Sequence, residues 1–146
     1  MSSDSLRFAW RVVSLAGLCC AVALATVACD QYRETQLVRS TPVGLLKPES
    51  PAALERAIET SLAGRGWAVK ERAPQRYVAE LHERNFVVTV AVVYNADSAR
   101  IDYIDSQNLL YQKTDSGEII HKKYATWIKN LANDIRTNVS RGPMPK

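Results

Sequence analysis

The chain has 146 residues and a formal net charge of +4, and charged residues make up 23% of it. This length allows one small domain beside short flanking segments, and so mild and scattered a charge does not indicate a nucleic-acid-binding protein. Cys19 and Cys20 lie inside an apolar run, which leaves Cys29 alone downstream and excludes a disulfide framework or a cysteine zinc site there.

The first thirty residues have the pattern of an export signal. Arg7 and Arg11 precede an apolar run over residues 12–28, and Ala28 stands directly before Cys29. A basic start, an apolar middle and a final small residue are typical of a secretory signal. This segment resembles the lipobox of bacterial lipoprotein precursors. The resemblance implies a signal peptide over 1–28, cleavage before Cys29, and a thiol that carries fatty acyl chains such as palmitate.

Two other interpretations of the same segment stay open. A leader peptidase could cut after the A-x-A sequence of residues 23–25, which would give plain secretion. The run over 12–28 could also remain as an uncleaved anchor, since it reaches the lower end of the ~17–25 residues that span a bilayer. Thr26 departs from the lipobox pattern, in which leucine is usual three residues before the cysteine.

The residues after Cys29 bear on sorting. Asp30 and Gln31 resemble the inner-membrane retention signal of enterobacterial lipoproteins, which favours the inner over the outer membrane. Two or three acyl chains on one cysteine would hold the chain stably, since each buried CH₂ contributes about 0.8 kcal/mol. Residues 29–47 show no sustained period, so we expect the lipidated cysteine and a flexible tether, with a reach of about 60 Å when extended.

A first helix is predicted from residue 51. Ser50 is a candidate N-cap, and Pro51 suits the first helical position. The apolar stripe consists of Leu54, Ala57, Ile58, Ser61 and Leu62. Gly64 and Gly66 then predict the end of the helix, with Trp67 packed beneath it.

Four strands are predicted next, over residues 67–72, 77–83, 86–94 and 100–106. The segment 77–83 alternates, and Arg84-Asn85 offers a two-residue turn. Residues 86–94 are apolar on both faces, which indicates a central strand. Strands joined by such short links are expected to pair antiparallel.

A polar, turn-like stretch over 107–117 separates these strands from a final helix, predicted over 119–139, and residues 141–146 are expected to form a frayed tail. The expected domain, 48–140, is therefore of the α+β class. We expect a two-layer sandwich of about four antiparallel strands, covered on one face by two helices in the order αββββα.

The sequence carries no recognisable catalytic constellation. His82 and His121 lack the spacing of a zinc site and are expected to be ordinary exposed residues, and no phosphate-binding or nucleophile motif occurs. We therefore expect a protein that is not an enzyme and that needs no cofactor or metal.

Three segments together resemble a family of small proteobacterial lipoproteins of unknown function: Gly66-Trp67, residues 103–111 and residues 124–131. The resemblance implies a lipoprotein of this shape and supplies no activity. Within the second segment, a ligand or partner contact is possible at Tyr103, Asp105, Ser106, Asn108 and Tyr111. The alternative is that Asp105, Ser106 and Asn108 are turn formers that bond their own backbone.

The predicted function is therefore a non-enzymatic, membrane-anchored envelope lipoprotein with its domain in the periplasm, which binds a protein or another envelope component. The alternative is a periplasmic carrier or sensor of a small amphiphile, lined by Trp67, Tyr103, Tyr124 and Trp127. The expected partners are the membrane, through the N-terminal lipid, and an envelope protein.

Overall fold

The computed structural model describes residues 33–141. The predicted signal peptide, Cys29, Asp30, Gln31 and the tail beyond residue 141 lie outside the described residues. The elements in chain order are β1 (Glu34–Gln36), β2 (Ser40–Leu45), α2 (Pro51–Gly64), β3 (Trp67–Ala73), β4 (Arg76–Glu83), β5 (Phe86–Tyr94), β6 (Ser98–Gln107), β7 (Gln112–Thr114), β8 (Gly117–His121) and α3 (Lys123–Arg141).

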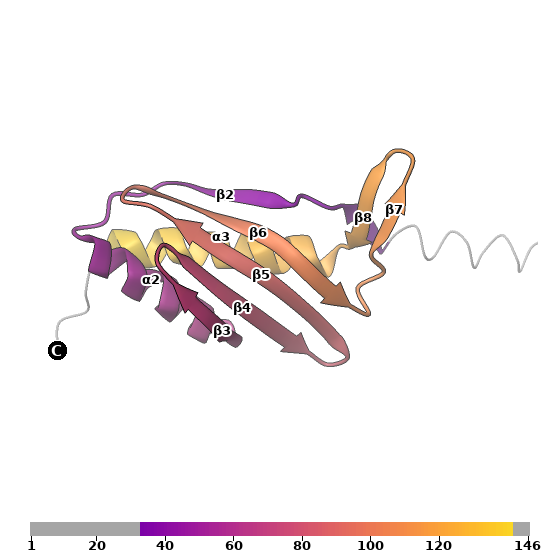
Figure 1. The fold of residues 1–146 in the computed structure, drawn as a ribbon, viewed down its shortest axis with the longest axis horizontal. Coiled ribbons are helices and arrows are strands. Elements are labelled where there is room, and N and C mark those ends of the chain that lie inside the picture. The colour runs from indigo at the N-terminus through magenta and orange to yellow at the C-terminus, as the bar shows by residue number, and fades with distance from the viewer. Residues whose placement is uncertain (1–32, 142–146) are drawn as a thin grey trace, which may run out of the picture. The chain divides into compact units, whose positions relative to one another are not determined.

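The predicted α+β class is confirmed, with a larger sheet than expected (Figure 1). A five-stranded sheet has the order β2-β6-β5-β4-β3, and its neighbouring strands pair antiparallel. A three-stranded sheet has the order β1-β8-β7. The four predicted strands are β3 to β6, and β5 is the central strand, as its two apolar faces indicated.

The prediction of a flexible tether over 29–47 is wrong for residues 34–36 and 40–45, which form strands β1 and β2. Residues 40–45 form β2, which pairs with β6 at one edge of the five-stranded sheet. The Ser40 hydroxyl donates a hydrogen bond of 2.6 Å to the Asp102 carboxylate, and Val43 is fully buried. The register shifts between Pro42 and Gly44, and this irregularity removes the regular alternation by which a strand is recognised in sequence.

Helix α2 forms as predicted. The Ser50 side chain accepts a hydrogen bond of 3.2 Å from the Ala53 N–H, and Pro51 occupies the first turn, where its missing N–H leaves no bond unmade. All five residues of the predicted stripe are buried. Gly66 takes a φ of 74° after the helix ends, and Trp67, only 4% exposed, packs in the core.

The final helix starts later than predicted. Residues 117–121 form β8, and α3 begins at Lys123. Ile120 and Tyr124 are both buried and lie four residues apart, which is the spacing of a helical period. Ile120 nevertheless belongs to strand β8, and only Tyr124 belongs to the helix. The expected loop over 107–117 likewise contains β7, which pairs with β8 in a hairpin.

Both helices lie on one side of the five-stranded sheet (Figure 1). The core between the layers is formed by side chains from one face of the sheet and from the apolar stripes of the helices, among them Leu54, Ile58, Leu62, Ala79, Val90, Ile101, Leu131 and Ile135. This arrangement is the two-layer packing expected for an amphipathic sheet and amphipathic helices.

Candidate functional site

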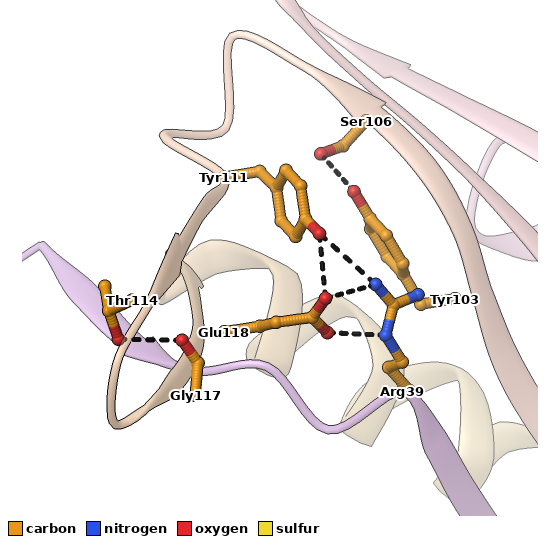
Figure 2. A network of polar contacts seen from close by, with 7 residues as sticks. All are labelled: Arg39, Tyr103, Ser106, Tyr111, Thr114, Gly117 and Glu118. Atoms are coloured by element: carbon orange, nitrogen blue, oxygen red, sulfur yellow. Dashed lines mark hydrogen bonds and ion pairs between the residues drawn. The ribbon is translucent and has the colours of Figure 1, made fainter.

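A polar network joins the two sheets (Figure 2). Arg39, in the link between β1 and β2, donates from Nε and Nη2 to the two carboxylate oxygens of Glu118 on β8, each at 2.5 Å. The Tyr111 hydroxyl, just before β7, donates to Glu118 Oε1 at 2.9 Å and accepts from Arg39 Nη2 at 3.2 Å. This bidentate pair fixes the planes of both charged groups.

Aromatic rings form one wall of the network. The rings of Tyr103 on β6 and Tyr111 are stacked, with centroids 5.8 Å apart, and the Arg39 guanidinium lies 5.6 Å from the Tyr103 centroid. The Tyr103 hydroxyl lies 2.9 Å from Ser106 Oγ, which keeps it apart from the carboxylate (Figure 2). The Tyr103 amide also donates to the Arg39 carbonyl at 2.7 Å.

The charges of the network stabilise one another. The hydrogen bond from Arg39, followed by that from Tyr111, holds the pKa of Glu118 below its usual value against the opposing effect of desolvation. The same bonds to Glu118 raise the pKa of Arg39 and that of Tyr111. Burial raises the pKa of Tyr103, and the Ser106 hydrogen bond opposes that shift. Each polar side chain of the network thus has a hydrogen-bond partner within the network. We infer that the network stabilises the contact between the two sheets.

A short, strained reversal carries Tyr111 to Tyr103. Asn108 and Leu110 have φ values of 60° and 54°, in the left-handed region that side chains other than glycine seldom adopt. Leu109 between them is only 1% exposed, and its carbonyl accepts a hydrogen bond of 2.8 Å from the His121 amide. The buried leucine therefore holds the reversal in place.

The five residues predicted as a contact site are only partly brought together. Tyr103, Ser106 and Tyr111 meet in the network. Asp105 is exposed on β6 opposite Thr89, and the Asn108 amide donates across to the Asn85 carbonyl at 2.7 Å. The alternative prediction is that Asp105, Ser106 and Asn108 bond their own backbone. The Ser106 side chain instead contacts the Tyr103 hydroxyl, and the Asn108 side chain bonds the backbone of Asn85.

Sequence reasoning missed Arg39 and Glu118. Arg39 lies in the predicted tether, Glu118 lies between the predicted loop over 107–117 and the helix predicted from residue 119, and 79 residues separate the two. The available signal was weak: Glu118 precedes an apolar pair after Gly117, in a stretch that reads equally well as a helix start.

A cavity of about 260 Å³ lies between β2 and α3. Its walls include Val38, Pro42, Ala125, Ile128 and Ala132, and its polar members are Gln36, Thr41, Tyr124, Lys129 and Arg136. Tyr124 connects it to the network, because its ring meets that of Tyr103 edge-on at 5.5 Å. The Tyr124 hydroxyl is buried without a hydrogen-bond partner among the described residues, which costs about 1–3 kcal/mol.

The aromatic residues predicted to line an amphiphile site do not share that cavity. Trp67 and Tyr103 are core residues, and Trp127 packs partly buried beside Phe86 at 6.2 Å between ring centroids. Tyr124 is the one of the four that lines the cavity between β2 and α3.

A larger hollow of about 530 Å³ lies at one end of the five-stranded sheet. Its lining includes Pro42, Gly44, Val93 and Arg100. The Arg100 guanidinium is already engaged, since its Nε lies 3.0 Å from the Asp102 carboxylate. This hollow therefore provides fewer unpaired charged groups for a ligand than the cavity between β2 and α3 does.

The histidines differ in their surroundings. His82 is exposed, as predicted, and its Nε2 lies 2.5 Å from Glu80 Oε1. His121 is buried, contrary to the prediction, because the chain places it at the end of β8, where its Nδ1 accepts from the Lys123 amide at 3.1 Å. Within residues 33–141, no three histidine, cysteine or carboxylate side chains gather as a metal site would require.

No protein-family model matches the chain, and no curated protein was found to match it. The part of the chain that the structure describes contains no helix long and apolar enough to cross a membrane.

Proposed function

We propose that this protein is a non-enzymatic envelope lipoprotein, anchored in the membrane by acyl chains on Cys29, whose periplasmic domain binds an envelope component. The observation that carries the proposal is the order of Arg7, the apolar run over 12–28 and Cys29, the lone cysteine downstream of that run. Asp30 and Gln31 favour the inner membrane as the site of anchoring.

The early start of β1 supports a short connection to the bilayer. Four residues separate Cys29 from Glu34, where β1 begins, and the five steps between these two residues extend at most about 18 Å at ~3.3–3.6 Å per step. The domain of such a lipoprotein would therefore stay close to the membrane surface. The expected tether of about 60 Å would instead have allowed it to move farther from the bilayer.

The bare face of the five-stranded sheet is the surface that best suits a protein partner. The helices cover the other face (Figure 1), and Val78, Val87 and Val93 lie partly exposed on the bare one. Charged pairs flank these valines: the Lys70 and Glu80 side chains lie 3.0 Å apart, as do those of Arg100 and Asp102. An apolar centre with a polar rim is the usual anatomy of a protein interface.

The anchor is tested by the intact mass of the protein extracted from membranes. The expected mass is that of a chain starting at Cys29 with two or three acyl chains. Cys29→Ser should abolish the acylated species, whereas Cys20→Ser, within the removed segment, should leave the mature mass unchanged. A free thiol at Cys29, or a retained leader, would overturn the proposal.

The partner is tested by site-specific photo-crosslinking in cells. A photoreactive residue at His82, on the bare sheet face, is expected to give one adduct of discrete mass, and the same residue at Thr126, exposed on α3, should not give it. Equal adducts at both positions, or none at His82, would contradict binding through this face.

A second candidate function, a carrier or sensor of a small amphiphile, is favoured by the cavity between β2 and α3. Its mixture of apolar walls and cationic side chains is what such a ligand requires.

A further inference from the structure

The cavity between β2 and α3 is shaped by small side chains. Ala125, Ile128 and Ala132 follow one another at helical spacing along α3 and face β2. Val38, Thr41 and Pro42 form the opposite wall. The two alanines leave a hollow that longer side chains would fill.

Two cations on α3, Lys129 and Arg136, border this hollow without a carboxylate partner among the described residues. Lys129 has no ion pair within residues 33–141, and Arg136 donates only to the Asn133 side chain. Several other cations of the domain are paired, for example Arg65 with Asp134 at 2.5 Å and Lys123 with Glu83 at 3.6 Å. The cavity therefore combines an apolar interior with an uncompensated positive charge.

We propose that this cavity binds one fatty acid, with its acyl chain against Val38, Pro42 and Ile128 and its carboxylate beside Lys129 and Arg136. The volume of about 260 Å³ lies just below the ~300–1,000 Å³ of sites for drug-sized ligands, which suits a single chain and not a diacyl lipid. Charge complementarity selects an anionic headgroup over a neutral or cationic one.

The inference deepens the proposed function, on which it rests for a membrane that supplies the ligand. Cavity binding itself requires no acyl chain on Cys29. The two can therefore fail separately, provided that the acylation state of each preparation is known.

The test uses the full chain in nanodiscs of neutral phosphatidylcholine, with empty nanodiscs as the blank. Equilibrium dialysis against radiolabelled dodecanoate is expected to show saturable binding of one molecule per chain above the blank. Dodecanol, which has the same chain length without the charge, and butyrate, which has the charge without the chain, should both bind at least about tenfold more weakly.

Variants assign the binding to the cavity. Ala125→Trp fills the hollow from an exposed helical position and should abolish saturable binding, while Lys129→Gln combined with Arg136→Gln should weaken it at least about tenfold. Arg56→Gln, which removes one positive charge from the exposed face of α2, away from the cavity, is the control and should bind as the wild type.

Three results would overturn the inference: no saturable binding above empty nanodiscs, equal binding of dodecanol and dodecanoate, or unchanged binding by Ala125→Trp with a circular dichroism spectrum like that of the wild type. The intact mass of the same preparation separates the two proposals. An unacylated chain that binds dodecanoate supports the cavity and contradicts the anchor, whereas an acylated chain that binds none contradicts the cavity alone.

Discussion

The rings of Tyr103 and Tyr111 stack with 5.8 Å between their centroids, although one belongs to the five-stranded sheet and the other leads into the three-stranded sheet. Stacked pairs of this kind contribute about 0.5–1.5 kcal/mol beyond their buried area. The Arg39–Glu118 pair lies against the same rings, so packing and charge join the two sheets at one place.

Removing the Tyr111 ring should loosen the three-stranded sheet before the rest of the domain. Tyr111→Ala loses both the stacking and the hydroxyl bond to Glu118, whereas Tyr111→Phe keeps the stacking. We expect hydrogen–deuterium exchange in β7 and β8 to rise clearly in Tyr111→Ala and slightly in Tyr111→Phe, with exchange in β4 and β5 unchanged. Equal exchange in the two variants would show that the ring does not hold the hairpin.

Glu118 should make the stability of the domain depend on pH at the acid end. Because its pKa is lower in the folded state than the ordinary value of 4.5, its contribution is present above that value and is lost as the pH falls through the folded pKa. Urea unfolding of the wild type and Glu118→Gln should therefore differ near neutral pH and converge at more acidic pH. Glu49→Gln, at an exposed loop residue, provides the control and should follow the wild type throughout.

Two tyrosine-to-phenylalanine substitutions should have opposite effects. Tyr124→Phe removes a buried hydroxyl that lacks a partner and should leave the domain equally stable or up to about 1–3 kcal/mol more stable. Tyr94→Phe removes a hydroxyl that donates to Glu55 at 3.1 Å and should cost about 1 kcal/mol. Chemical denaturation measures both; a clear loss of stability in Tyr124→Phe would mean that the hydroxyl is bonded in solution.

The two glycines at the end of α2 should also respond in opposite directions to alanine. Gly66 has a φ of 74°, so Gly66→Ala should cost about 1–2 kcal/mol although space for a Cβ is open. Gly64 lies in the helix with open space around it, so Gly64→Ala should add about 0.4–1 kcal/mol. Thermal unfolding of both variants checks the pair, and a stabilised Gly66→Ala would exclude the left-handed turn.

The parts of the fold that sequence predicted are those with local signals. Helix α2 has a cap, a stripe and a stop within one segment, and strands β3 to β6 follow one another with short turns. Strand β2 lacked such signals, because Pro42 and Gly44 interrupt a short strand whose partner lies far along the chain. Ile120 fits both the period of a helix and that of a strand. Only the pairing of β8 with its neighbouring strands decides that it belongs to a strand.

The candidate site shows the same division more sharply. Tyr103, Ser106 and Tyr111 lie close in sequence, and the sequence predicts them as parts of one contact site. The ion pair that lies against them joins Arg39 and Glu118, which are 79 residues apart in the sequence. No local sequence pattern connects residues at such a separation. The cavity is harder still to foresee, because it arises from where β2 crosses α3 and from the small size of two alanines.

The place of β2 in the sheet has a consequence for the order in which the domain folds. Strands β3 to β6 can pair as successive hairpins, each of which closes a short loop. Strand β2 can pair only after a much longer loop closes, since Ser40 and its partner Asp102 are 62 residues apart. We therefore expect β2 to dock last, on a meander that is already formed. Until then the edge of β6 stays unpaired, and this edge is where a nascent domain would be exposed to mispairing with a neighbour.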